Sequence, residues 1–169
     1  IAYDPYPKEK SAHDLGFSYL PFADVLAKSD IISIHVPYME STHHLINRKA
    51  IKGMKKGAIL INTSRGAIVE TEALVEGLKE GLLGGAGLDV LEEEGAIKDE
   101  LSFLISGHPK EEQLKTMLAN HILIDHPSVI VTPHNAFNTS EALERILNAT
   151  VENIIAFTEG NPKNVVKNP

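Results

Sequence analysis

The sequence predicts an α/β fold organised around a doubly wound parallel sheet, and two features of the chain support this prediction. Apolar, β-branched runs at 31–36 and 58–61 are typical of strands that are buried on both faces of a sheet. Amphipathic stretches of about ten residues separate such runs, which is the pattern of crossover helices between parallel strands. Because ligands bind beyond the carboxyl ends of such strands, functional residues are expected directly after these runs.

Composition favours one acidic globular domain and argues against several other classes of protein. The chain has 169 residues, of which 43% are hydrophobic, and a formal net charge of −7. This balance argues against a nucleic-acid partner, which usually requires a basic face. The absence of cysteine excludes disulfides and thiolate metal sites, and no apolar run or leader segment suggests a membrane. We therefore expect a cytoplasmic protein with no membrane partner.

In the first half of the chain, prolines and apolar runs mark the boundaries of short elements. Pro21 is expected in the first turn of a helix that extends to Lys28, and Pro37 should end a strand because it cannot donate to a ladder. In order, the expected elements are the end of a strand at 1–4, a strand at 16–20, a helix at 21–28, a strand at 31–36 and a helix at about 47–55.

The second half continues the alternation of strands and helices. In order, the expected elements are strand 58–61, helix 70–80, strand 82–90, two short helices at 97–105 and 111–118, strand 129–132 and helix 140–159. The two short helices are expected to form an insertion over the edge of the site. The buried stripe of the last helix is expected to be Ala142, Ile146, Val151, Ile154 and Ile155.

Three ionisable residues follow the expected strands and are the candidate catalytic residues. Arg65 follows the run at 58–61, Glu94 follows the run at 82–90, and His134 follows the last strand. Arginine can bind a carboxylate bidentately, histidine transfers protons near neutral pH, and a carboxylate beside an imidazole favours its charged form. The sequence therefore predicts these three groups at one edge of one sheet.

Other charged residues and histidines of the chain are not expected to be catalytic or to bind metal. Glu92 and Glu93 are expected to be a solvated charge run beside Glu94. His43 and His44 are expected to be solvated, because adjacent residues in a loop rarely share one metal ion. No metal site is therefore expected, and no role is assigned to His108, His121 and His126.

Four motifs, in this order along the chain, resemble the NAD-binding domain of the D-isomer-specific 2-hydroxyacid dehydrogenase family. They are His35-Val36-Pro37 with Thr42 and Leu45-Ile46, then Ile61-Asn62-Thr63-Ser64-Arg65-Gly66, then Gly87-Leu88-Asp89-Val90 with Glu94, and Thr132-Pro133-His134. Each motif alone is weakly specific, but together they cover nearly the whole chain. The resemblance implies a Rossmann-type domain. Phe137 and the long insertion resemble the D-lactate dehydrogenase branch, although Phe137 has two interpretations, core packing or a wall of the substrate pocket.

The resemblance implies an NAD-dependent oxidoreductase that interconverts a 2-keto acid and a D-2-hydroxy acid, with pyruvate and D-lactate as the best single guess. It implies that Arg65 binds the substrate carboxylate, that His134 is the acid and base, and that Glu94 orients the ring of His134. NAD is expected rather than NADP, because Asp4 would hold the adenosine ribose and repel a 2′-phosphate. The implied cofactor contacts are Asp4, Val36, Pro37, Thr42, Thr63, Ser64, Arg65 and Asp89. A homodimer of the full-length protein is also implied.

The chain departs from this family in one respect, the absence of a Gly-x-Gly-x-x-Gly turn between a first strand and a first helix. The cluster at 84–87 lies within an expected strand. We therefore expect residues 1–169 to be a partial dinucleotide-binding domain without its first strand, glycine loop and first helix, and without a substrate domain. Such a fragment is expected to bind NADH weakly and to be inactive. The alternative is a dinucleotide-responsive, non-catalytic binding protein similar to the corepressors of this fold.

Overall fold

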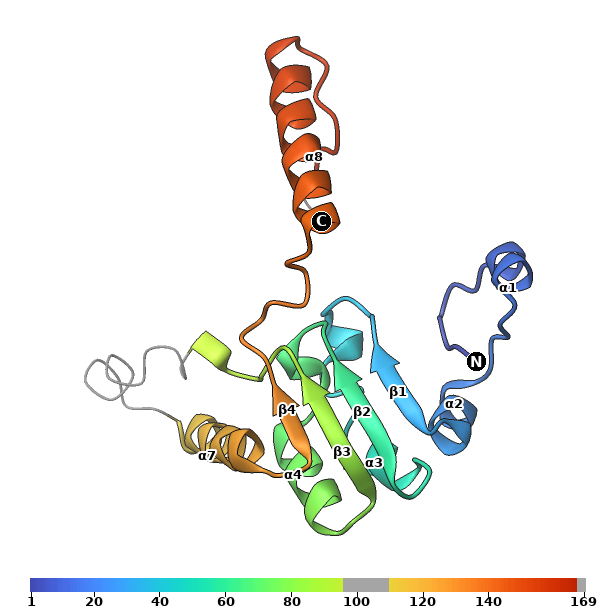
Figure 1. Ribbon diagram of the computed structural model, residues 1–169, viewed down its shortest axis with the longest axis vertical. Coiled ribbons are helices and arrows are strands. Elements are labelled where there is room, and N and C mark those ends of the chain that lie inside the picture. The colour runs from blue at the N-terminus through green and yellow to red at the C-terminus, as the bar shows by residue number, and fades with distance from the viewer. Residues whose placement is uncertain (96–109, 167–169) are drawn as a thin grey trace. The chain divides into compact units, whose positions relative to one another are not determined.

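The computed structural model describes residues 1–95 and 110–166, and the chain divides into two compact units (Figure 1). The first unit is Ile1–Pro133 and contains the sheet. The second unit is His134–Pro169 and contains one long helix. Each unit is described here by itself.

The first unit is built on a four-stranded sheet in which every strand pairs in parallel with the next, in the order β1-β2-β3-β4. The strands are β1 (Ile31–Ile34), β2 (Ala58–Asn62), β3 (Leu83–Leu88) and β4 (Val129–Val131). All four lie within one to two residues of the predicted ranges, so the predicted parallel α/β class is confirmed. In the register, Asn62 at the end of β2 lies opposite Ile34 of β1 and Leu88 of β3.

One face of the sheet is covered by α3 (Arg48–Lys52), α4 (Thr71–Lys79) and α7 (Glu111–Asp125). Figure 1 shows α3 and α4 behind the strands. The core lies between these helices and the sheet, and Leu60, Ile51 and Leu74 are among its most deeply buried side chains. The predicted amphipathic helix at 70–80 and the helix near 47–55 are therefore confirmed, the latter shorter than expected.

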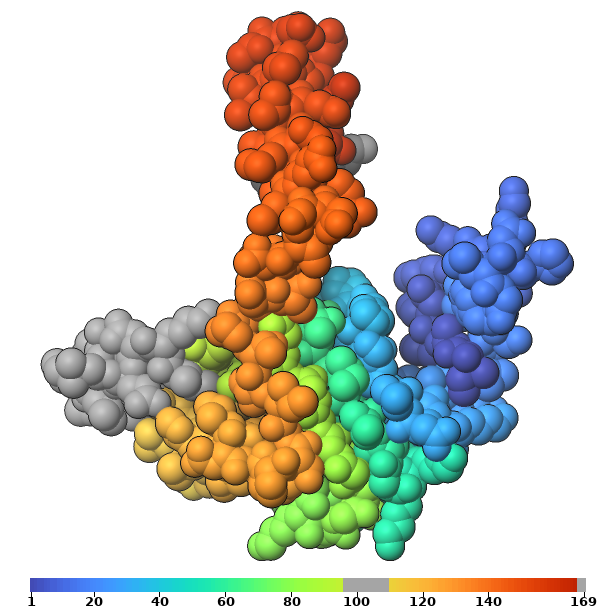
Figure 2. Space-filling view, viewed as in Figure 1, coloured from blue at the N-terminus to red at the C-terminus, as the bar shows by residue number. Residues whose placement is uncertain are grey.

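The opposite face of the sheet is open among the described residues. Ile31, Ile59 and Ile130 are 63%, 39% and 71% exposed. Figure 2 shows the atoms of β1 and β2 from this side, with no helix of the first unit in front of them. The prediction that these strands are buried on both faces is wrong for the described part of the first unit, because α3, α4 and α7 cover only the other face of the sheet.

The helix α7 corrects the interpretation of 111–118 as a short helix in an insertion over the site. α7 extends to Asp125 and packs against α4 and β4. Because β3 and β4 are parallel, their connection needs a crossover, and α7 supplies it. The helix expected at 97–105 lies outside the described residues.

The amino-terminal segment forms little regular structure. Ala2 and Tyr19 make one isolated parallel bridge, so the strand expected at 16–20 is reduced to a single paired residue. A helix that the sequence did not predict, α1 (Glu9–Leu15), lies between them and ends at Gly16 with a φ of 73°. The predicted helix α2 (Phe22–Lys28) is confirmed, with Pro21 at its N-cap instead of its first turn.

The glycine cluster at 84–87 lies within β3, as predicted, and serves backbone packing there. A Cβ at Gly84 would lie 2.6 Å from the carbonyl oxygen of Gly57, and one at Gly85 would lie 2.7 Å from that of Ser128. These glycines therefore let neighbouring segments approach the strand closely.

The second unit contains α8 (Ser140–Thr158), which confirms the predicted last helix. Thr139 caps it, since its hydroxyl accepts a hydrogen bond from the amide of Ala142 at 3.2 Å. The predicted buried stripe is wrong: Ile146, Val151, Ile154 and Ile155 are between 49% and 59% exposed. The described part of this unit has no second helix or strand to cover them. None of the described helices is both long and apolar enough to cross a membrane.

The two faces of the sheet predict different effects for neighbouring residues of β2. Leu60→Ala should lower the free energy of unfolding of the 169-residue chain by about 2–5 kcal/mol, because Leu60 is fully buried. Ile59→Ala is the matched control, and its loss should be about half of that or less. Urea denaturation measures both, and equal losses would contradict the one-sided core.

Candidate active site

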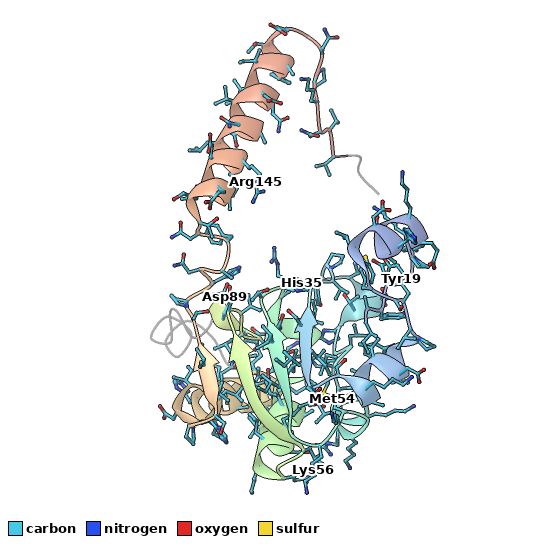
Figure 3. All side chains as sticks on the ribbon, turned by 45° about the vertical axis from the view of Figure 1, so that its right-hand side comes forward. Tyr19, His35, Met54, Lys56, Asp89 and Arg145 are labelled. Atoms are coloured by element: carbon cyan, nitrogen blue, oxygen red, sulfur yellow. The ribbon has the colours of Figure 1, made fainter. Side chains whose placement is uncertain are left out.

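The residues that follow the strands lie at one edge of the sheet. Val36 lies two residues after β1, Thr63 directly follows β2, and Asp89 directly follows β3. Figure 3 shows His35 and Asp89 at this edge and Met54 toward the opposite end of the strands. Parallel pairing therefore brings the predicted motifs of the first unit together, as the sequence analysis expected.

The turn after β2 is held by Asn62, whose side chain is buried with 1% exposure. Its Oδ1 accepts a hydrogen bond from the amide of Ser64 at 3.0 Å, and its Nδ2 donates to the carbonyl of Arg65 at 3.0 Å. The hydroxyl of Ser64 donates to the carbonyl of Val36. The turn that carries Arg65 is thus fixed to the end of β2 and to the segment after β1.

Arg65 is exposed at the end of this turn, and its Nη1 donates to the carbonyl of Ser64 at 2.7 Å. A guanidinium has five N–H donors in a planar fork, so one such bond leaves capacity for an anionic partner. Carboxylates fit this fork in a bidentate manner. The position is suitable for binding the carboxylate of a small acid at the sheet edge.

The turn after β3 is tied to the strands on both sides of it. The amide of Asp89 donates to the carbonyl of Asn62 at 2.9 Å. The carboxylate of Asp89, a residue with 5% exposure, accepts a hydrogen bond from the hydroxyl of Thr132 at 2.5 Å. Asp89 therefore joins the ends of β2, β3 and β4, a structural role that the sequence analysis did not assign to it.

Glu94 directly follows the next turn of the chain, formed by Glu92 and Glu93, and is half-buried. This turn touches the segment that carries Arg65, because a Cβ at Gly66 would overlap the carbonyl of Leu91 and the amide nitrogen of Glu92. Only glycine fits at position 66. Arg65 and Glu94 are therefore carried by two turns whose backbones are in contact.

Glu92 is largely buried instead of solvated, and His44 is paired with it although it stays partly exposed, which corrects the expectations for these two residues. The side chain of Glu92 is 14% exposed, and its Oε1 lies 2.7 Å from Nε2 of His44. Its Oε2 accepts a hydrogen bond from the hydroxyl of Thr71 at 2.8 Å. The rings of His43 and His44 are stacked with their centroids 3.9 Å apart. Within residues 1–95 and 110–166, no group of three or more histidine, aspartate or glutamate side chains is placed to hold a metal ion.

The loop after β1 is closed by Thr42. The hydroxyl of Thr42 accepts a hydrogen bond from the amide of Met39 at 2.8 Å and donates to the carbonyl of Pro37 at 2.8 Å. Asp4 is exposed, and its Oδ1 accepts a hydrogen bond from the amide of Tyr6 at 2.8 Å. The cofactor contacts expected of these residues remain predictions.

His134 is the first residue of the second unit, whereas Arg65 and Glu94 belong to the first. It is half-buried, and its φ of 55° lies in the left-handed region that residues with side chains rarely adopt. Such backbone strain is frequent at functional sites. Phe137 is 53% exposed, so the interpretation of this residue as core packing is wrong for this chain.

The chain resembles one protein family over most of its length. Residues 1–136 match the family described as D-isomer specific 2-hydroxyacid dehydrogenase, NAD binding domain. This range includes the strands β1 to β4, the two turns that carry Arg65 and Glu94, and His134.

Individual relatives agree with this match and are longer than the chain. A glyoxylate reductase of Thermococcus litoralis is 40% identical over 167 residues, which cover 98% of this chain and 44% of that protein. A D-lactate dehydrogenase of Treponema pallidum is 34% identical over 162 residues, which cover 96% of this chain and 46% of that protein. The chain spans less than half the length of these relatives.

A solved structure of the same kind matches the fold. The D-lactate dehydrogenase from Aquifex aeolicus, complexed with NAD and lactic acid, superposes with a TM-score of 0.79 at 38% sequence identity. The superposition covers 94% of this chain and 46% of that chain.

The role of Asn62 predicts that its amide nitrogen is needed. Asn62→Asp should lower the free energy of unfolding by about 1–3 kcal/mol, because a carboxylate cannot donate to the carbonyl of Arg65. Asn47→Asp is the control, since Asn47 uses only its Oδ1, which accepts from the amide of Ala50 at 3.0 Å as an N-cap. Its effect should stay within about 0.5 kcal/mol. Equal effects in urea denaturation would rule out the proposed role of Nδ2.

Proposed function

Because the chain belongs to the D-isomer specific 2-hydroxyacid dehydrogenase family, as an NAD-binding domain, we propose that the protein carrying it interconverts a 2-keto acid and a D-2-hydroxy acid. The observation that carries the proposal is the contact between the turn of Arg65 and the turn of Glu94 at the carboxyl edge of the sheet. Open α/β sheets bind their ligands at this edge.

In this reaction each residue has a separate task. The fork of Arg65 binds the substrate carboxylate and draws the neighbouring carbonyl into a fixed orientation. His134 donates a proton to the carbonyl oxygen during reduction and removes it during oxidation. Glu94 holds the imidazole ring of His134 in the orientation needed for proton transfer. NAD, when bound, supplies or accepts the hydride.

The residues present fit a dinucleotide along this edge. The side chain of Asn62 holds the turn at 63–65 by its hydrogen bonds to Ser64 and Arg65. Thr63 and Arg65 are exposed on this turn. We assign the nicotinamide side to Thr63, Ser64, Arg65 and Asp89, the pyrophosphate to Thr42, and the adenosine side to Asp4, Val36 and Pro37. Asp4 is exposed and is suited to accept hydrogen bonds from ribose hydroxyls, which favours NAD over NADP.

We also propose that the full-length protein contains more than these 169 residues. The sequence has no Gly-x-Gly-x-x-Gly turn, and β1 pairs only with β2 among the described strands. The relatives are about twice as long as the chain. A first strand with its glycine loop and helix, and a separate substrate domain, would complete a cytoplasmic, homodimeric dehydrogenase. The 169-residue chain alone would bind NADH weakly without turnover.

The substrate we propose is pyruvate, with D-lactate as the product. The full-length protein should reduce pyruvate with NADH and oxidise D-lactate in preference to L-lactate, measured by NADH absorbance. Faster reduction of glyoxylate than of pyruvate would instead indicate the activity for which the Thermococcus litoralis relative is named. A preference for L-lactate would contradict the proposal, and NADH binding without any turnover would favour the non-catalytic alternative.

The proposed proton transfer predicts a separation of rate from affinity at His134. His134→Gln in the full-length protein should lower kcat by roughly 10²–10⁴-fold while leaving the Kd for NADH unchanged. His13→Gln is the control, because the side chain of His13 is 91% exposed on α1. A fall in NADH affinity as large as the fall in rate would show that His134 has a binding role instead.

A further inference from the structure

Glu92 lies two residues before Glu94 and is held by both of its carboxylate oxygens. Oε1 is 2.7 Å from Nε2 of His44, and Oε2 accepts a hydrogen bond from the hydroxyl of Thr71 at 2.8 Å. Its side chain is only 14% exposed, although its neighbour Glu93 is exposed. A carboxylate withdrawn from water in this way requires such partners. Glu92 is therefore set apart from the surface glutamates of the run.

The same carboxylate caps α4 from a distant part of the chain. Thr71 is the first residue of α4, and its amide nitrogen lies 3.4 Å from Oε2 of Glu92. The N-cap residue Glu70 makes no side-chain capping bond. Amides at the amino end of a helix lack partners within the helix and attract negative charge. Glu92 thus fastens its own turn to the start of α4, 21 residues away in the sequence.

The backbone of the turn is held from two further sides. The carbonyl of Glu92 accepts a hydrogen bond from Nδ2 of Asn120 on α7 at 2.7 Å. On another side, Gly66 lies against the peptide between Leu91 and Glu92, where a Cβ would overlap it. The turn is therefore fixed to α4, to α7 and to the segment that follows Arg65.

A strained residue separates Glu92 from Glu94. Glu93 has a φ of 55°, in the left-handed region that side chains disfavour. Such a conformation persists only where the surrounding structure imposes it. The contacts of Glu92 supply that constraint on one side of Glu93, and Glu94 follows directly on the other. If Glu92 were released, Glu93 could relax and displace Glu94.

We propose that Glu92 is a positioning residue. Its bonds to His44 and Thr71 hold the turn before Glu94 against the segment that follows Arg65, and so fix Glu94 relative to Arg65. The proposal rests on the proposed function, in which Glu94 orients His134. This role requires no contact of Glu92 with substrate or cofactor. Its effect on catalysis passes through Glu94 alone.

A double-mutant cycle in the full-length protein tests this dependence. Glu92→Ala should lower kcat/KM for the 2-keto acid by roughly 10-fold or more in the wild-type background, but by less than about 2-fold when Glu94 is already replaced by Gln. It should also shift the pH dependence of kcat/KM in the same direction as Glu94→Gln. Equal losses in the two backgrounds would overturn the proposal, since they would show that Glu92 acts independently of Glu94.

Three further variants separate positioning from folding. Glu92→Gln should restore most of the activity, because a glutamine oxygen can still accept from Thr71 while its amide faces His44. Thr71→Val repeats the cycle with a milder change if Glu92→Ala fails to fold, and it should show the same dependence on Glu94. Glu72→Ala, at an exposed neighbouring position on α4, should leave activity unchanged.

The cycle also distinguishes this proposal from the function on which it rests. If Glu94→Gln alone changes neither the rate nor its pH dependence, the proposed role of Glu94 is wrong and the positioning role is overturned with it. If Glu94→Gln is slow and Glu92→Ala or Thr71→Val is as fast as the wild type, only the positioning role is overturned.

Discussion

The parallel pairing of β2 with β3 is the constraint on which the candidate site depends. It sets Asn62 opposite Leu88, so the turns that follow the two strands begin side by side. The amide of Asp89 then donates to the carbonyl of Asn62, which extends the contact one residue beyond the strands. Gly66 has no side chain, so the backbone of Leu91 and Glu92 can pack against it. Strand register thus brings the turns after β2 and β3 side by side, and side-chain contacts such as those of Glu92 then hold them there.

Hydrogen bonds, more than apolar contacts, shape this edge of the sheet. The described residues that are both polar and buried are Asn62, Thr71, Asp89 and Asn120. Each makes a hydrogen bond to a turn or strand end of the candidate site. Satisfied polar networks of this kind favour one arrangement of the backbone over others. Asn120 is satisfied only in part, because its Oδ1 has no hydrogen-bond partner among the described residues.

The strands and the principal helices could be predicted because their causes are local. Apolar, β-branched runs predicted the strands β1 and β2, and the spacing of apolar residues at 70–80 predicted α4. α1 was missed because Ala12 is its one buried residue, which leaves no amphipathic pattern to detect. The stripe of α8 was identified correctly as apolar, but periodicity does not reveal whether a second layer covers a helix.

The candidate site shows the same division between local and distant causes. Arg65 and Glu94 were predicted from their places after strands, and the structure brings their turns into contact. Glu92 was taken for a solvated charge because its partners, His44 and Thr71, are 48 and 21 residues away in the sequence. Nothing in the spacing of a glutamate run distinguishes the member that a fold will bury. The hydrogen bonds of Thr132 to Asp89 and of Asn120 to Glu92 were not predicted for the same reason.

The central proposal is that Arg65, Glu94 and His134 act together on a 2-keto acid. A crystal structure of the full-length protein with NADH and oxamate, which has the shape and charge of pyruvate, tests it most directly. The account predicts the oxamate carboxylate on the fork of Arg65, and a ring nitrogen of His134 within hydrogen-bonding distance of the oxamate carbonyl with Glu94 on the other nitrogen. Oxamate bound with its carboxylate away from Arg65, or with His134 remote from its carbonyl, would contradict the account.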